Sequence, residues 1–151
     1  MDEAAWQQVL EKDELERKRL EQLVHKLTAE DLSRPMEAGW TVSAVLAHLA
    51  FWDLRACTLI TQWRQSGVKP SAIDTDAINE VTRELFLAIP PRAAARLALD
   101  KATALHRLLQ ELKPDLIESI RTVGTNVRLE RFVHRGLHLD EIEKTLSAAP
   151  R

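Results

Sequence analysis

The chain has 151 residues, of which 45% are hydrophobic and 29% are charged, which is the composition of a folded globular protein. Lys and Arg together number 21 and Asp and Glu 23, so the formal net charge is −2. This balance argues against a nucleic-acid partner held by a basic surface and against a polybasic protein of the membrane surface. We expect one domain over residues 1–151.

Two further features bear on the cellular compartment. The single cysteine, Cys57, excludes an internal disulfide, so nothing in the fold requires an oxidising compartment. No apolar run approaches the roughly 20 residues of a membrane span, and the acidic start does not resemble a signal peptide. We therefore expect a cytoplasmic protein with no membrane partner.

Glycine, proline and capping residues divide the chain into helices. With 4 Gly, 6 Pro and no Tyr, beside abundant Ala, Leu, Glu and Arg, helix is favoured almost throughout. We expect long helices over residues 2–27, 41–66, 91–112 and 126–148, a shorter helix after Asp74 and a short extension from Pro114. Thr41 is expected to cap the second long helix. Four amphipathic rods of this length bury their apolar faces most simply as a bundle, so we predict an all-α four-helix bundle.

The first long helix has a polar middle. Asp13 and Arg17 stand where apolar residues would continue its stripe. Trp63, on the second long helix, has no evident partner in the sequence pattern. A subunit interface would use both features, so a homodimer is one expectation.

Three of the 5 histidines form a pattern that metal ions use. His134 and His138 are four residues apart and therefore share one face of the last helix. His48 lies at the edge of the apolar stripe of the second long helix. Together they would form a three-nitrogen metal site with an open position for water or substrate. The alternative, exposed His134 and His138 with His48 bonded to a backbone carbonyl, stays open at this point, and His25 and His106 are given no role.

Several residues near these histidines are candidates for supporting roles. Asp53 and Glu130 are the carboxylates best placed to orient an imidazole N–H group. For Asp53, an ordinary charge at the far edge of the apolar stripe is an equal alternative. Trp40 and Trp52 could form the wall of a pocket beside His48, although a Trp on a core stripe is more often part of the core. Asn79 is expected to cap or brace the second crossover, with facing the site as the alternative.

Three arginines flank the histidines in the last predicted helix. Arg128, Arg131 and Arg135 could hold carboxylates of a thiol cofactor or substrate, but a solvated face is the favoured interpretation.

Residues 39–53 resemble the signature of the DinB/YfiT-like superfamily, and they read GWTVSAVLAHLAFWD. The pattern is Gly-Trp-Ser/Thr-Val, then Leu-x-His-Leu, then an aromatic pair and an acid. Residues 76–79 are similar to the family's segment in the second crossover, and residues 134–142 to its closing HxxxH block. In this block Arg135, Gly136 and Leu137 stand where the family usually has an aromatic residue and an acid. The resemblance covers roughly residues 20–146.

The resemblance implies an up-down-down-up bundle with a short extra helix in the second crossover. It also implies a divalent metal, most often nickel or zinc, on His48, His134 and His138. In some members a Glu four residues before a His is a ligand, which makes Glu130 a substitute ligand in an alternative register. Members of known activity are largely thiol-dependent: mycothiol-dependent maleylpyruvate isomerase, and bacillithiol or mycothiol S-transferases.

The function expected from this resemblance is a metal-dependent enzyme, a thiol-dependent S-transferase or a hydrolase. Its partners would be a small-molecule substrate and a low-molecular-weight thiol. The alternative is a non-catalytic bundle that binds a ligand or a protein. A role in the DNA-damage response, suggested by the family name, is disfavoured by the charge balance.

Overall fold

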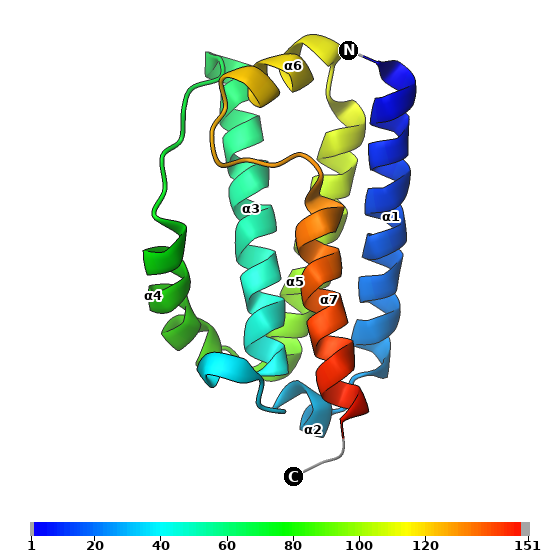
Figure 1. The fold of residues 1–151 in the computed structure, drawn as a ribbon, viewed down its shortest axis with the longest axis vertical. Helices are drawn as coiled ribbons and strands as arrows, with labels where there is room; N and C mark the ends of the chain where they lie inside the picture. The colour runs from blue at the N-terminus through cyan, green and yellow to red at the C-terminus, as the bar shows by residue number, and fades with distance from the viewer. Residues whose placement is uncertain (1, 149–151) are drawn as a thin grey trace.

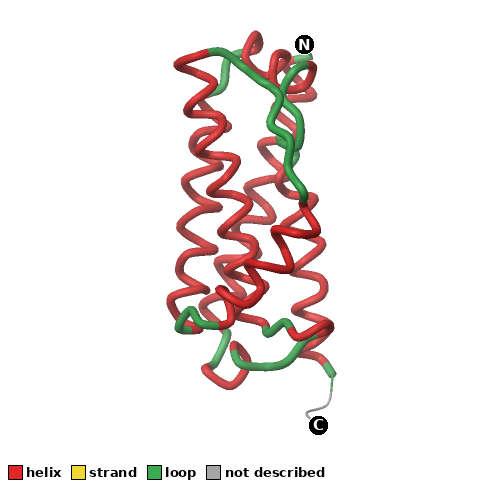
Figure 2. Tube along the Cα trace, turned by 90° about the vertical axis from the view of Figure 1, so that its left-hand side faces the viewer, coloured by secondary structure: helices red, strands yellow, loops and turns green. Residues whose placement is uncertain are grey.

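The computed structural model describes residues 2–148, and this part of the chain is all-α, as predicted. The elements are α1 (Glu3–Lys26), α2 (Ala29–Leu32), the 3-10 turn η1 (Glu37–Gly39), α3 (Val42–Ser66), α4 (Thr75–Leu87), α5 (Pro91–Glu111), α6 (Pro114–Thr122) and α7 (Arg131–Ser147). Figure 2 shows these residues as helices joined by loops. The long helices α1, α3, α5 and α7 lie side by side, and α4 lies along α3 in the second crossover (Figure 1).

Local signals in the sequence place most helix starts. The Thr41 hydroxyl accepts a hydrogen bond from the backbone N–H of Ala44 at 3.1 Å, and Asp74 caps α4 through Ala77 at the same distance. Pro91 and Pro114 each occupy the first turn of a helix, where a missing N–H leaves no intrahelical bond unmade.

The predicted start of the last helix at residue 126 is wrong, because α7 begins at Arg131. Asn126 has a positive φ of 59°, a left-handed conformation that does not continue a helix. Its carbonyl accepts from the Arg55 guanidinium at 2.6 Å, and its side-chain amide donates to the Ser71 carbonyl at 2.9 Å. These contacts tie the loop before α7 to the loop after α3.

Helix α3 is the central element, since it packs against α5, α4 and α7. It meets α5 at a face of small residues, where Ala94, Ala95, Ala98 and Ala102 are fully buried. Among the described residues, α3 is also the one helix long and apolar enough to span a membrane, by length and composition alone. In this fold, 56% of its most apolar stretch is buried, as expected of a core helix.

A layer of buried charged and polar residues divides the interior. Its members are Asp13, Asp53, His106, Arg131 and Arg135, and we call them the polar layer. Along α3, Asp53 lies between Leu49 of one apolar cluster and Ala56 of the other.

The two features that suggested a homodimer are both used inside the chain. Asp13 of α1 is fully buried in the polar layer. Trp63 is 5% exposed, and a Cβ at Gly124 would meet its ring at 3.1 Å. Asp13 therefore faces the interior of this chain, and Trp63 has a packing partner within it.

The close approach of α3 and α5 leads to a stability prediction. Ala98→Leu should lower the free energy of unfolding by about 1–3 kcal/mol, because the larger side chain must be forced between two packed helices. Ala104→Leu, at an exposed position of α5, is the control and should change stability by less than about 0.5 kcal/mol. Urea unfolding measures both, and equal effects would contradict the packing described here.

Candidate functional site

The structure brings three of the predicted site residues together. His48 of α3 and His134 and His138 of α7 each offer one nitrogen, and these atoms all lie within 4.8 Å of one another. The Nε2 atoms of His48 and His134 are 3.1 Å apart. The His134 and His138 rings meet edge to face at 4.7 Å between centroids, as expected for residues one turn apart.

His48 lies at the floor of the site between two tryptophans. It is 6% exposed, and its ring is edge-on to Trp40 at 5.5 Å and to Trp52 at 6.4 Å between centroids. The Trp52 indole N–H donates to the Asn79 side-chain oxygen at 3.1 Å, which links α3 to α4. The predicted pocket wall beside His48 is thus present, and Asn79 braces it.

Burial keeps two of the imidazoles neutral. Burial, with the charges of His138 and Arg131, lowers the pKa of His48 from 6.5 to about 3. Burial and then the charge of Arg131 lower the pKa of His134 to about 2. Neutral imidazoles are the form that binds metals, so neither ring has a positive charge to lose before it can serve as a ligand.

The donor set fits a divalent ion. Three imidazole nitrogens suit zinc, nickel and related ions. Two nitrogens bound to one tetrahedral ion at about 2.0–2.1 Å lie about 3.3 Å apart, close to the 3.1 Å between His48 and His134. Behind His138, Nδ1 lies 3.0 Å from the Glu141 carboxylate, the kind of partner that orients a metal-binding imidazole.

A cleft of about 2060 Å³ opens over the histidines. Its lining includes Trp40, Trp52 and Asn79, together with two exposed apolar residues of α7, Val133 and Leu137. A small molecule in this cleft would therefore contact polar imidazoles and apolar side chains together.

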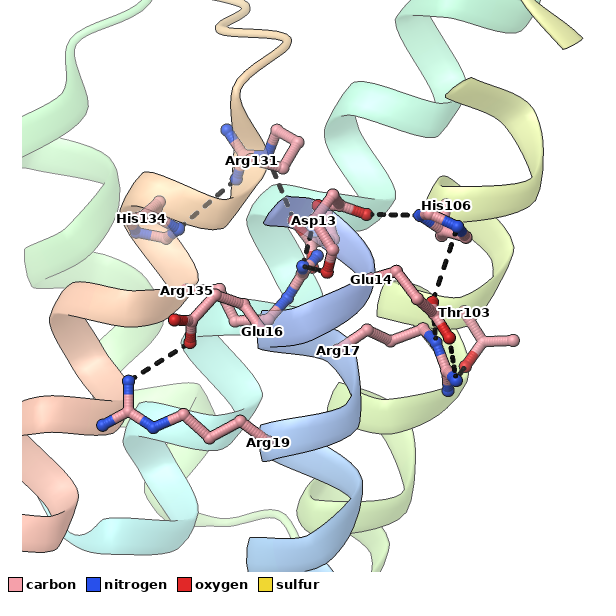
Figure 3. Close-up of polar contacts among 11 residues, drawn as sticks. Asp13, Glu14, Glu16, Arg17, Arg19, Thr103, His106, Arg131, His134 and Arg135 are labelled. Atoms are coloured by element: carbon pink, nitrogen blue, oxygen red, sulfur yellow. Dashed lines mark hydrogen bonds and ion pairs between the residues drawn. The ribbon is translucent and has the colours of Figure 1, made fainter. Parts of the chain in front are cut away.

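The polar layer reaches the site through the contact of Arg131 with His134 (Figure 3). Arg135 donates to Asp13 at 2.9 Å and to Asp53 at 3.1 Å. The second carboxylate oxygen of Asp13 pairs with Nδ1 of His106 at 2.8 Å. Burial alone would lower the pKa of the Arg135 guanidinium, but the charges of Asp53 and Asp13 raise it, so the side chain stays charged.

Arg131 connects this layer to the histidines. Its Nε donates to Asp53 at 3.1 Å, and one terminal nitrogen lies 3.3 Å from Nδ1 of His134. Arg131 is only 9% exposed. The polar layer therefore ends in direct contact with one of the candidate ligands.

Two expected roles need correction. Neither Asp53 nor Glu130 hydrogen-bonds an imidazole: Asp53 pairs with arginines, and Glu130 pairs with Arg121 at 2.7 Å. Glu130 precedes the first residue of α7, so the change in helix start removes the expected one-turn spacing to His134. The structure does not support Glu130 as a substitute ligand.

The expected solvated row of arginines is also wrong. Arg131 and Arg135 are buried, and Arg128 lies on the loop before α7, where it is exposed and lines the cleft. The expectation failed because the buried carboxylates that pair with these arginines come from α1 and α3, far away in sequence.

Sequence reasoning missed the roles of three residues, two in the polar layer and one beside a candidate ligand. The polar position of Asp13 in an apolar stripe was visible, but its partner was not. His106 had no pattern at all. Glu141, three residues after His138, had the spacing of a helix-face pair, which could have pointed to it. Cys57 is half-buried, and burial raises the pKa of its thiol to about 11, so the thiol stays protonated at neutral pH.

Removal of Arg135 should destabilise the fold. Arg135→Met leaves two buried carboxylates without their shared partner, so the free energy of unfolding should fall by about 3–5 kcal/mol. Arg64→Met breaks the exposed pair with Glu111 and should cost less than about 1 kcal/mol. Urea unfolding of both variants measures the difference, and a small loss for Arg135→Met would contradict the role of the polar layer.

The buried histidines predict a dependence of stability on pH. In metal-free protein the unfolded chain takes up protons below pH 6.5, while folded His48, with a pKa of about 3, does not. Stability should therefore fall as the pH is lowered from about 7 to 5, by about 1–2 kcal/mol for this one residue.

Between pH 7 and 5 the His48→Gln variant should lose about 1–2 kcal/mol less stability than the wild type, because it has no imidazole at this position to take up a proton on unfolding. Urea unfolding at several pH values in the presence of a chelator tests it, with His25→Gln, at an exposed position, as the control. Parallel curves for the wild type and His48→Gln would show that burial does not keep this imidazole neutral.

Comparison with known proteins agrees with the resemblance found in the sequence. One family model, the mycothiol maleylpyruvate isomerase N-terminal domain, matches residues 14–146. Searches of curated proteins and of solved structures gave no match. The matched range contains the three histidines and four of the five polar-layer residues. The predicted resemblance is thereby confirmed: the chain belongs to the family of the mycothiol maleylpyruvate isomerase N-terminal domain, within the DinB-like superfamily.

Proposed function

We propose that this protein is a metal-dependent enzyme in which His48, His134 and His138 hold a divalent ion, nickel or zinc. We further propose that it acts with a low-molecular-weight thiol. The observation that carries the proposal is the convergence of three imidazole nitrogens within 4.8 Å in an open cleft. The family model supports the thiol, because its description names mycothiol.

We also propose that the chain forms one domain in which the long helices have the up-down-down-up arrangement. The packing of α3 and α1 against α5, and of α1 against α7, supports it. So does the path of the chain in Figure 1, in which α4 belongs to the long crossover between α3 and α5. In this arrangement α3 and α7 present their histidines to one another.

The proposed reaction is the transfer of a thiol sulfur. A divalent ion on three neutral imidazoles would favour the thiolate form of a bound thiol at neutral pH. The sulfur then forms a bond to an electrophilic carbon, the leaving group departs with its bonding electron pair, and the thiol proton passes to solvent. With water in place of the thiol, the same residues would support hydrolysis.

The other side chains of the cleft would bind the reactants. Val133 and Leu137 offer apolar contact beside the histidines, and Trp52 is held in place by Asn79. Arg128 and Lys144 line the same cleft and would pair with anionic groups of the thiol or the substrate. Among the described residues no Ser, Cys or Lys is hydrogen-bonded to one of the three imidazoles, so the nucleophile would be the thiol.

The first test is the metal content of the purified protein. We expect about one equivalent of nickel or zinc per chain, lost in His48→Ala and in His138→Ala because each removes one of three ligands. His106→Ala is the matched control, since it removes a buried imidazole outside the cluster and should leave the metal in place. Elemental analysis after gel filtration measures all four proteins.

The second test measures activity in the same preparations. Metal-loaded protein should consume mycothiol, bacillithiol or glutathione in the presence of an electrophile, and His138→Ala should not. Protein that stays metal-free on titration with zinc and nickel would overturn the proposal. Bound metal without any thiol or hydrolytic turnover would favour the non-catalytic alternative.

A further inference from the structure

The three histidines differ in what faces their second nitrogen. At His138, the Glu141 carboxylate lies 3.0 Å from Nδ1. A carboxylate only accepts hydrogen bonds, so Nδ1 of His138 carries a proton, and in the neutral ring Nε2 then holds the lone pair. This is the tautomer that a metal needs at Nε2, and a carboxylate behind the ring is the usual support for it.

His134 has the opposite environment. The group 3.3 Å from its Nδ1 is the Arg131 guanidinium, which only donates hydrogen bonds. Nδ1 of His134 therefore holds the lone pair, and in the neutral ring the proton is on Nε2. That proton points at Nε2 of His48, 3.1 Å away.

The state of His48 agrees with this assignment. If Nε2 of His48 accepts from His134, its own proton is on Nδ1. Nδ1 of His48 is buried and has no hydrogen-bond partner among the described residues. His48, like His138, thus presents a lone pair on Nε2, and His134 alone does not.

Arg131 is held firmly in this position. Its Nε donates to Asp53 at 3.1 Å, and Asp53 is fixed in turn by Arg135 at 3.1 Å. All three side chains are nearly inaccessible to solvent. The contact with His134 is therefore part of the polar layer rather than a chance approach of a mobile side chain (Figure 3).

We infer that Arg131 is a positioning residue that sets the tautomer of His134 and opposes metal binding there. For Nε2 of His134 to become a ligand, its proton must leave, Nδ1 must take one up, and Arg131 must give up its contact. The positive charge of Arg131 adds to this opposition, because it lies beside the ring that would face the ion. The metal part of this inference rests on the proposed function, whereas the tautomer part does not.

The first experiment reads the tautomer directly. Long-range proton–nitrogen NMR spectra of metal-free protein with ¹⁵N-labelled histidine distinguish a proton on Nδ1 from one on Nε2. In the wild type, His134 should carry its proton on Nε2, and His138 should carry it on Nδ1. A wild-type His134 with its proton on Nδ1 would overturn the inference, whatever the variants do.

The second experiment measures zinc affinity by competition with a chromophoric chelator. Arg131→Met should bind zinc about tenfold to a hundredfold more tightly than the wild type, the usual size of effects from groups behind a ligand. Arg128→Met removes an equal charge from the same cleft without touching His134, and should stay within about twofold of the wild type. Arg131→Lys, which keeps the charge and a donor, should return the affinity toward the wild-type value.

The Glu141→Ala variant should change the zinc affinity in the opposite direction. It removes the carboxylate behind His138 and should weaken zinc binding by about tenfold. Arg131→Met that binds zinc no more tightly than Arg128→Met would overturn the inference while leaving the metal site intact. If no variant binds zinc, the proposed function fails, and the wild-type NMR spectrum still decides the role of Arg131. The same spectrum decides it if Arg131→Met does not fold.

Discussion

The rest of the structure depends on one buried interaction, the fork of Arg135 between Asp13 and Asp53. A single buried charge would cost several kcal/mol, but here one guanidinium satisfies a carboxylate from α1 and another from α3. Because Arg135 belongs to α7, the interaction fixes three long helices relative to one another. Apolar side chains can slide past each other by small steps, whereas an ion pair at about 3 Å tolerates little movement.

The candidate site takes its geometry from this interaction. His134 precedes Arg135 in the chain, and His138 follows one turn later on the cleft side of α7. Asp53 lies on α3 five residues after His48. The contact that joins Arg135 to Asp53 therefore sets the two helices that carry the histidines at a fixed height and rotation. Arg131 extends the same network to His134, so the buried charges of the core also act on a candidate metal ligand.

The sequence predicted those features that depend on local physics. Helix starts at Thr41, Asp74, Pro91 and Pro114 follow from capping and from the fixed φ of proline, and the structure has them. The three histidines could be proposed from helix spacing and from the family resemblance. The start of α7 could not, because it is set by Asn126 and by the tertiary contact of that residue with Arg55.

The polar layer shows the other limit of sequence reasoning. A charged residue near a helical stripe is most often solvated, and that prior gave the wrong environment for Arg131 and Arg135. The expectation fails because the carboxylates that pair with these arginines, Asp13 and Asp53, lie on two other helices. Asp13 was conspicuous as a charge in an apolar stripe, but its partner is 122 residues away in the chain. Periodicity within one helix carries no signal for such a pairing.

Buried polar atoms without hydrogen-bond partners indicate that the polar layer and the histidines serve a functional site. Among the described residues, two buried side-chain nitrogens have no hydrogen-bond partner: Nδ1 of His48 and Nε of Arg135. Each such atom costs about 1–3 kcal/mol, which a purely structural core would avoid by using apolar residues. One of these atoms belongs to a candidate ligand, and the other to the residue that follows another candidate ligand. These two unsatisfied nitrogens lie in the chain's interior, one in the histidine cluster beside an open cleft and the other in the polar layer that contacts this cluster. Such a concentration of unsatisfied polar atoms is expected at a functional site and not in a purely structural core.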